Sequence, residues 1–318
     1  MTDWAASIEA ARKRLRGLIV ETPLVSWDEG LWLKCENAQV TGSFKLRGAL
    51  NKILVLSADE LRSGVVAASA GNHGQGVAYA ARLVGTKATI VVPDDAVRRK
   101  VDGMRRLGAE VVQIPGGYGA AEASGRRLAQ ERRAVWVSPY NDAEVIAGQG
   151  TIGLELIEQI PAFAGGVEVF VPVSGGGLAS GIGLSLEKWA ERFRVLAVQV
   201  ENAAYMHALF HGLDPRQVVE TATLADGLSG PVEESAITLE LVRRVARDVL
   251  LVSEAELLAA LRFAWVEKAL PMEPSSAVAL AAALRQGPRQ GRARIVIVSG
   301  GNVPMETLTA LEGRGGSA

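Results

Sequence analysis

The residue with the clearest capacity for chemistry is Lys45, in the run TGSFKLRGA. Phe44 precedes it and a helix-like segment, residues 46–49, follows it, so an aromatic ring should lie beside the amine and no carboxylate is adjacent in the chain. Partial burial disfavours the charged ammonium form and predicts a lowered pKa for Lys45. A neutral amine can attack a carbonyl carbon or hold an aldehyde as a Schiff base. The alternative is an ordinary lysine whose stem covers an apolar surface.

A glycine run supplies a second chemical feature. In VFVPVSGGGLASG, the residues Ser174, Gly175, Gly176 and Gly177 come directly after a strand-like segment and before a helical pattern. Such a loop exposes backbone N–H groups at a helix N-terminus, which is a phosphate-binding arrangement. It lacks the Lys-Ser/Thr pair of a nucleoside-triphosphate loop and the acidic residue that binds a ribose. The loop therefore predicts a monophosphate ligand, with a tight structural turn as the alternative.

Polar residues also follow two other strand-like segments. After GVVAA, the run SAGNHGQG offers N–H groups for a substrate carboxylate, and the Asn72 amide could donate to a phenolic oxygen. For His73 taken alone, a helix-start residue is the preferred interpretation. After RIVIV, the Ser299 hydroxyl could meet a ring nitrogen without giving it a charge. A Schiff-base lysine, a phosphate loop, this amide and this hydroxyl together match the groups of pyridoxal 5′-phosphate.

Short apolar runs and helical patterns alternate along the chain and predict the elements that carry these residues. Near-continuous β-branched runs are typical of parallel strands buried on both faces. Ligands bind at the carboxyl ends of such strands. We therefore expect an α/β, two-lobed, open parallel-sheet fold, with a large discontinuous domain in residues 1–52 and 144–318 and a small domain in 53–143. The predicted strands are 64–69, 88–93, 109–114, 167–173, 194–200 and 294–299.

Composition narrows the class of protein. The 318 residues are 48% hydrophobic and carry a net charge of −1, which favours a globular enzyme. Basic residues alternate with acids, as in the expected solvated helix faces ERRAVW and LVRRVARD, so no nucleic-acid partner is predicted. The single cysteine, Cys35, argues against an intrachain disulfide and for a reducing compartment. The first 19 residues predict a capped amphipathic helix, no run is long enough to cross a membrane, and we expect a cytoplasmic protein.

Several motifs resemble those of one enzyme family, both in their residues and in their order along the chain. KCENAQVTGSFKLRGA, SAGNHGQGVAYAA, PVSGGGLASG, TLADGLSG, EPSSAVALAA and VSGGN resemble the pyridoxal-phosphate-dependent threonine/serine dehydratases and serine racemases, which have the tryptophan synthase β-type fold (fold type II). The resemblance covers nearly the whole chain. It implies that Lys45 is the catalytic, Schiff-base lysine. It also implies a cofactor-binding set of Phe44, Lys45, Asn72, Ser174, Gly175, Gly176, Gly177, Leu178 and Ser299, and a substrate-binding set of Ser69, Ala70, Gly71, Asn72, His73 and Gly227.

Departures from the family pattern indicate the reaction. Racemases of this family carry a serine at the position of Ala70, on the face opposite the lysine, and alanine has no proton to give. The resemblance therefore implies α,β-elimination, in which L-threonine, L-serine or a related β-hydroxy amino acid gives a 2-oxo acid and ammonia. Serine racemase and 3-hydroxyaspartate dehydratase remain alternatives. A cysteine or threonine synthase, or a non-catalytic relative, is a more distant one.

Further expectations also come from the resemblance. A divalent-cation site would need carboxylates beginning at Glu201, but the second position is His207, so no metal is predicted. Glu273 could lie near the cofactor or cap the following helix, and the two interpretations are ranked equally. The chain ends soon after the last motif, which favours a catabolic role without feedback through an added domain. The family also implies a homodimer or homotetramer that binds a small amino acid.

Overall fold

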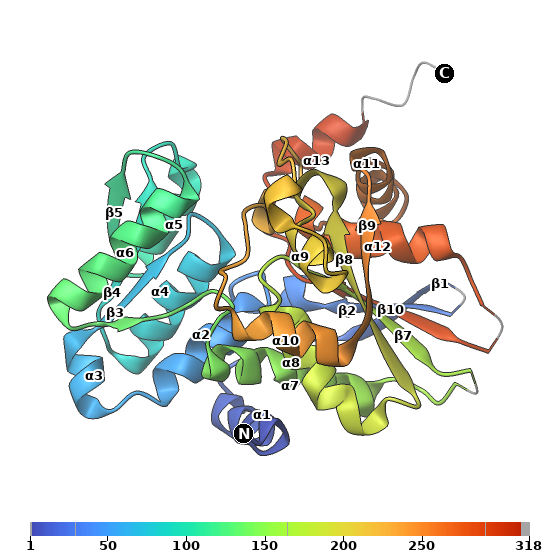
Figure 1. Ribbon diagram of the computed structural model, residues 1–318, viewed down its shortest axis with the longest axis horizontal. Helices are drawn as coiled ribbons and strands as arrows, with labels where there is room; N and C mark the ends of the chain where they lie inside the picture. Colours follow the sequence, from blue (N-terminus) through green and yellow to red (C-terminus); the bar gives the residue numbers. More distant parts are fainter. Residues whose placement is uncertain (1, 29, 164, 290, 313–318) are drawn as a thin grey trace.

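The computed structural model describes residues 2–28, 30–163, 165–289 and 291–312, and it contains two β-sheets that lie side by side (Figure 1). The larger sheet has the strand order β1-β2-β10-β7-β8-β9. Its neighbouring strands pair parallel, except that β1 and β2 are antiparallel. The strands are β1 (Leu24–Asp28), β2 (Leu31–Cys35), β7 (Val167–Pro172), β8 (Phe193–Val200), β9 (Ala246–Val252) and β10 (Ala293–Val298).

The smaller sheet is parallel throughout and has the order β5-β4-β3-β6. All four of its strands fall within residues 53–143, the range predicted for the small domain, and the strands of the larger sheet fall outside that range. The domain limits themselves stay a prediction. The strands are β3 (Val65–Ala68), β4 (Ala88–Pro93), β5 (Glu110–Ile114) and β6 (Val135–Trp136).

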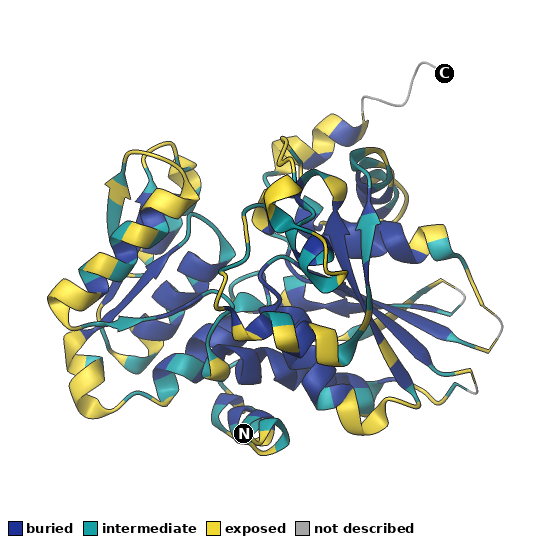
Figure 2. Cartoon of the chain, in the orientation of Figure 1, coloured by how far each residue is buried: buried dark blue, intermediate teal, exposed yellow. Residues whose placement is uncertain are grey.

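Helices cover both faces of each sheet and leave the central strands of both sheets mostly dark blue, or buried, in Figure 2. In the larger sheet, α11 and α12 pack on one face, and α7 and α8 pack on the other. In the smaller sheet, α4 and α5 share a core on one face and α6 packs on the other. The helices are α1 (Trp4–Leu15), α2 (Lys45–Leu54), α3 (Ala58–Ser63), α4 (Asn72–Val84), α5 (Arg98–Arg106), α6 (Tyr118–Arg132), α7 (Ala143–Gln159), α8 (Gly177–Leu186), α9 (Tyr205–Phe210), α10 (Ile237–Val245), α11 (Glu254–Arg262), α12 (Pro274–Gln286) and α13 (Met305–Glu312).

The predicted fold class and its six strands are confirmed. β7 and β10 are buried at every position, and β4 is buried at all but its last residue, as expected for parallel strands between helical layers. The first predicted helix is also present, because α1 begins after Asp3, whose side chain accepts a hydrogen bond from the N–H of Ala6 at 3.1 Å. A continuous apolar run therefore identified β4, β7 and β10 from the sequence.

Two expectations about local structure were wrong. The segments ERRAVW and LVRRVARD are not continuous helix faces: the first passes from α6 into β6, and the second passes from α10 into β9. These two strands are only partly buried, so they lack the continuous apolar run that identified the others.

Helices α2, α7 and α8 cross at glycines, where their backbones touch. A Cβ at Gly148 of α7 would lie 2.6 Å from the carbonyl oxygen of Arg47 in α2, and one at Gly48 would lie 2.7 Å from the carbonyl oxygen of Val145. A Cβ at Gly181 of α8 would lie 2.7 Å from the Gly150 nitrogen. Such contacts are below van der Waals distance, so only glycine allows this close packing. The crossing places the start of α2 at a defined position between the two sheets.

Candidate active site

Two neighbouring strands of the larger sheet end at the candidate site. β10 and β7 pair in parallel, so Ser299 and Ser174, which follow them, leave the same edge of the sheet. Ser299 is 3% exposed, and its Oγ lies 3.0 Å from the Oγ of Ser276 in α12. Ser276 also donates to the carbonyl oxygen of Gly300 at 2.9 Å. Ser299 therefore presents a neutral hydroxyl in a fixed, buried position.

Lys45 is the first residue of α2 and lies next to this strand end. The N–H of Phe44 donates to the carbonyl oxygen of Ser299 at 3.0 Å, and Ser43 forms a β-bridge with Gly300. The Lys45 amine donates to the carbonyl oxygen of Pro139 at 2.9 Å and lies 5.1 Å from the centroid of the Phe44 ring. Burial lowers the pKa of Lys45 to about 8, and the nearby Glu273 carboxylate opposes this shift. The predicted fall in pKa is confirmed.

Asn72 begins α4 and links the smaller sheet to the same strand end. Its Nδ2 donates to both carboxylate oxygens of Glu273, at 2.8 and 3.0 Å. Its Oδ1 accepts a hydrogen bond from Asn302 Nδ2 at 2.7 Å, which fixes the direction of the amide. Burial raises the pKa of Glu273, although the Asn72 hydrogen bond opposes that change. Asn72 is thus oriented as a donor toward Glu273, beside Gly300.

Glu273 was expected either to cap the helix that follows it or to lie near the cofactor. Its backbone is at the N-cap position of α12, and its side chain points to the candidate site. It is the N-cap residue of α12, but no side-chain hydrogen bond caps the helix. Its carboxylate binds Asn72 instead, and its N–H donates to the carbonyl oxygen of Gly300 at 3.1 Å. The structure therefore places the Glu273 carboxylate among the candidate site residues.

The glycine run forms the turn between β7 and α8. Gly176 is the N-cap residue with φ +88°, a conformation that favours glycine, and it provides no side-chain cap. The first N–H groups of a helix have no acceptor within it and can bind an anion. A Cβ at Gly177 would lie 2.9 Å from Tyr140 atoms, and a Cβ at Gly175 would overlap the Tyr140 ring. Thr238 Oγ1 also holds the loop, through a 2.6 Å hydrogen bond to the carbonyl oxygen of Gly175.

These residues fit pyridoxal phosphate as a set. Lys45 supplies an amine with a lowered pKa, the start of α8 supplies N–H groups for a phosphate, and Ser299 supplies a neutral hydroxyl. Contacts also connect the parts, because the Lys45 amine binds Pro139 and the adjacent Tyr140 lies against the glycine loop. The assignment of individual roles to Phe44, Asn72 and Leu178 remains a prediction.

The loop between β3 and α4 holds the residues that were predicted to bind substrate. Ser69 Oγ accepts a hydrogen bond from the N–H of Gly71 at 3.1 Å, and Ala70 packs partly buried against the core of the smaller sheet. His73 is 3% exposed, and its Nε2 lies 2.9 Å from the carbonyl oxygen of Val137, so this nitrogen must carry the proton. Burial and the nearby Lys45 charge lower the pKa of His73 to about 3. The His73 ring is therefore neutral.

The remaining predicted residues lie farther along the chain. Gly227 is in a short 3₁₀ turn (Asp226–Leu228), and a Cβ there would lie 2.9 Å from the Oγ of Ser275. Glu201 is exposed, and the ring of His207 is held by the carbonyl oxygen of Val249, 2.6 Å from Nδ1. Across the residues that the structure describes, no three His, Cys, Asp or Glu side chains gather as a metal site would require.

Reasoning from sequence missed Pro139 and Tyr140. Both follow β6, so they also lie after a strand end, where ligand-binding residues are expected. Their position after a strand end was the available signal. The sequence does not show that strand clearly, because β6 has only two residues and both are partly buried. Tyr140 donates no side-chain hydrogen bond to the glycine loop; its hydroxyl accepts one from the N–H of Glu233 at 3.1 Å, which holds its ring in place.

Comparison with known proteins gives the family. The model of the family described as "Pyridoxal-phosphate dependent enzyme" matches residues 15–301, which include every predicted site residue. The chain belongs to this family of pyridoxal-phosphate-dependent enzymes. Pyridoxal 5′-phosphate is therefore the cofactor of this enzyme. Within the described residues, no helix is long and apolar enough to cross a membrane.

Relatives within the pyridoxal-phosphate family carry several named activities, among them threonine ammonia-lyase and serine racemase. The chain is 38% identical to the L-threonine ammonia-lyase of Thermotoga maritima, over 97% of this chain and 78% of the relative. It is 34% identical to the serine racemase of Dictyostelium discoideum, over 96% of each chain. The solved structure of maize serine racemase superposes with a TM-score of 0.85 at 32% identity, covering 96% of this chain and 95% of that one. The chain is thus a fold type II enzyme of the threonine dehydratase and serine racemase group.

The Glu273 carboxylate should control the protonation of Lys45. Because Glu273 raises the pKa of Lys45, Glu273→Gln should move that pKa further below about 8. The pH dependence of Lys45 acetylation in the cofactor-free protein, read by peptide mass spectrometry, measures the change. Glu306→Gln, an exposed substitution in α13, is the control and should leave the midpoint unchanged. A midpoint that stays the same or rises in Glu273→Gln would contradict the electrostatic role.

Proposed function

We propose that this enzyme is an ammonia-lyase that acts on L-threonine, L-serine or a related β-hydroxy amino acid. Elimination of water gives an enamine, which leaves the enzyme and is hydrolysed by one water to a 2-oxo acid and ammonia. The observation that carries the proposal is an asymmetry of proton donors. Lys45 is a buried amine with a pKa near 8, whereas Ala70 places a methyl group in the loop predicted to face it. One acid/base group suits elimination, while racemisation needs a second group on the other face of the α-carbon.

The other side chains of the loop support this asymmetry. The His73 ring is neutral, buried and turned to the carbonyl oxygen of Val137, so it is not available to move a proton at the α-carbon. The Ser69 hydroxyl accepts a hydrogen bond from Gly71 within its own loop. The loop N–H groups at the start of α4 remain suited to a substrate carboxylate. In this proposal the loop orients the substrate and Lys45 alone carries the proton.

Bound pyridoxal phosphate supplies an electron sink for the bond broken at the α-carbon. The chain's own residues do the rest. Lys45, whose lowered pKa of about 8 leaves a substantial neutral fraction near that pH, takes the α-proton, and its neighbour Phe44 keeps water from one side of the amine. The N–H groups at the start of α8 would hold the phosphate, and this would fix where the reacting carbon lies. Ser299, whose Oγ is held 3.0 Å from the Oγ of Ser276, would face the ring nitrogen with a neutral hydroxyl and would deliver no extra charge.

Steady-state assays on a short substrate panel test the proposal. L-threonine, L-serine and 3-hydroxyaspartate should give 2-oxo acid and ammonia in equal amounts, with little D-serine from L-serine. O-acetylserine and O-phosphohomoserine should give no synthase product when a nucleophile is added. If L-serine gave D-serine at the same rate as pyruvate, the serine racemase alternative would be favoured. That alternative is also supported by the similarity to serine racemases.

A single substitution should introduce the missing proton donor. Ala70→Ser should raise D-serine formation from L-serine at least about tenfold, because a positioned acid contributes roughly 10²- to 10⁴-fold when its placement is good. Chiral chromatography of the products measures the gain. Ala70→Gly, which adds no proton, is the matched control and should remain at the wild-type level. Equal racemisation in both variants would show that the effect came from altered packing.

The remaining proposals concern metabolic role, location, assembly and metal requirement. We propose a catabolic, cytoplasmic enzyme that forms a homodimer or homotetramer and needs no metal. The single cysteine supports a reducing compartment: Cys35 is buried, and burial raises the pKa of its thiol to about 11, so it is an unreactive thiol. Light scattering of the purified protein measures the oligomer, and assay in the presence of EDTA measures any need for a cation.

A further inference from the structure

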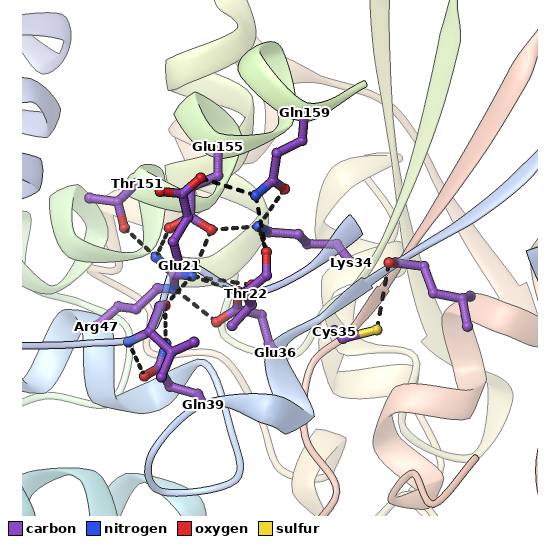
Figure 3. Close-up of polar contacts among 12 residues, drawn as sticks. Glu21, Thr22, Lys34, Cys35, Glu36, Gln39, Arg47, Thr151, Glu155 and Gln159 are labelled. Atoms are coloured by element: carbon purple, nitrogen blue, oxygen red, sulfur yellow. Dashed lines mark hydrogen bonds and ion pairs between the residues drawn. The ribbon is translucent and has the colours of Figure 1, made fainter. Parts of the chain in front are cut away.

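A network of buried charged side chains lies beside α2 (Figure 3). At its centre, Arg47 Nε and Nη2 each donate to the Glu36 carboxylate at 2.8 Å. On the other side, Nη1 and Nη2 donate to the Glu155 carboxylate at 2.5 and 2.9 Å. The Arg47 and Glu36 side chains are fully buried, and that of Glu155 is 11% exposed. One guanidinium is therefore held in two directions by two carboxylates.

Other members of the network balance its charge and connect it to the fold. Lys34 Nζ donates to Glu155 and, at 2.6 Å, to the carbonyl oxygen of Thr22. Two cations thus face two anions. Burial alone would lower the pKa of Arg47, but the carboxylates of Glu36 and Glu155 outweigh it and raise that pKa. The partners come from β2 (Lys34), a short 3₁₀ turn (Glu36–Ala38) and α7 (Glu155), so the network joins three elements to α2.

The position of Arg47 on α2 links this network to Lys45. The two residues are two apart in a helix, so their side chains leave it about 200° apart around the axis. Lys45 points toward Pro139 at the candidate site, and Arg47 points into the network on the other side. Phe44, the N-cap residue of α2, forms no side-chain cap. No side-chain cap fixes the first turn of α2. Arg47 fixes it instead, on the side of the helix opposite Lys45, through its hydrogen bonds to Glu36 and Glu155.

Stability alone does not account for the network. Replacing a buried ion network with apolar side chains of similar volume is often neutral or stabilising, because removing charges from water is costly. An arginine fork bound to two carboxylates does, however, fix direction as well as distance, which a lysine or an apolar side chain does not. The arginine that forms this fork is two residues from Lys45. It binds Glu155 of α7, the same helix whose Gly148 packs against the Arg47 backbone.

We propose that Arg47 is a positioning residue for Lys45. Its guanidinium, held between Glu36 and Glu155, fixes the rotation and height of the first turn of α2, and this fixes the place of the lysine amine beside Phe44 and Pro139. The inference rests on the proposed function of Lys45 as the acid/base group. Arg47 touches neither substrate nor cofactor and acts only through the helix.

Arg47→Lys tests the proposal, because it keeps the charge and removes the fork. If the turn loosens, the Lys45 amine becomes more exposed, and the midpoint of its acetylation in the cofactor-free protein should rise from about 8 toward the ordinary value of about 10.4. In the cofactor-loaded enzyme kcat should fall about 30- to 100-fold, the scale of a misplacement near 1 Å, while KM stays within about threefold. Since the charge is unchanged, the shifted midpoint reports position.

Arg294→Lys is the matched control. Arg294 is also a buried arginine, 5% exposed, in β10 of the same sheet, and it donates to the carbonyl oxygen of Ala283 at 2.8 Å, away from α2. It should lose thermal stability as Arg47→Lys does but keep the Lys45 midpoint and kcat. If Arg47→Lys does not fold, the double variant Thr22→Val with Thr151→Val removes two hydrogen bonds to the guanidinium and should raise the midpoint by a smaller amount.

Two results would overturn the inference. One is a folded Arg47→Lys protein with a wild-type Lys45 midpoint and kcat within about twofold of wild type. The other is an equal change in Arg294→Lys, since this would show a general effect of buried lysine. The midpoint is measured without cofactor or substrate, so it decides the role of Arg47 even if the proposed dehydratase reaction fails its own assay.

Discussion

Replacing Lys45 with alanine is expected to lower turnover by at least about 10³-fold, because one residue supplies the covalent link to the cofactor and the acid/base group. The amine is held in place by the carbonyl oxygen of Pro139 at 2.9 Å and its pKa is lowered to about 8, so it is available in its neutral form near physiological pH. The variant should still bind free cofactor weakly through the loop at α8. Rates of 2-oxo acid release, with and without added cofactor, measure the loss.

Lys52→Ala is the matched control on the same helix. Lys52 pairs with Asp142 at 2.7 Å and is not a predicted site residue, so its loss should leave turnover near wild type. Borohydride should attach the cofactor to Lys45 in the wild-type and Lys52→Ala proteins and to no residue in Lys45→Ala. Substantial dehydratase activity in Lys45→Ala, or labelling of another lysine, would refute the assignment.

Gly175→Ala should weaken cofactor binding roughly 10- to 100-fold, the loss that corresponds to the usual 1–3 kcal/mol of overpacking. A methyl group at Gly175 would overlap the Tyr140 ring, and that ring cannot simply move because its hydroxyl accepts a hydrogen bond from Glu233 at 3.1 Å. The loop should shift instead, and its N–H groups should no longer converge on a phosphate. Fluorescence titration of the cofactor-free protein measures the dissociation constant.

Two further variants show whether the steric cause is correct. Gly103→Ala, in α5, meets only the end of the Arg106 side chain at 3.8 Å and should bind the cofactor normally. Adding Tyr140→Ala to Gly175→Ala should restore part of the lost affinity, because the smaller side chain leaves room for the methyl group. If the double variant binds no better than Gly175→Ala, the loop is disturbed for another reason.

The sequence predicted the buried parts of the fold better than its edges. Five of the six strands found in advance are buried over most of their length, and burial of that kind needs no tertiary information to recognise. The sixth, β5, lies at an edge and is only partly covered, but its apolar residues still mark it. β1, β6 and β9 were missed, since β1 and β9 lie at the edges of the larger sheet and β6 lies at the edge of the smaller one, where side chains are only partly covered. β2 was missed although it is largely buried, because Lys34 interrupts its apolar run.

Site residues could be predicted from the sequence where a short segment by itself indicates the role of a residue. A glycine with φ +88° at Gly176 and a lysine without a local carboxylate both leave a signal in a single segment. The hydrogen bonds of Glu273 and Tyr140 could not be read from their own segments, because their partners, Asn72 and Glu233, lie more than 90 residues away in the chain. Contacts of that range are set by the pairing of the strands and the packing of the helices, which local pattern does not specify.

The glycine crossing of α2, α7 and α8 has a consequence for how this protein tolerates mutation. Gly48, Gly148 and Gly181 belong to none of the predicted binding or catalytic sets, yet a side chain at any of them would push apart the helices that support Lys45 and the phosphate loop. In a library of random variants under selection for activity, these three positions should accept as few replacements as the lysine itself. Sequence variation alone would then make them look like active-site residues, although their contribution is to the spacing of helices.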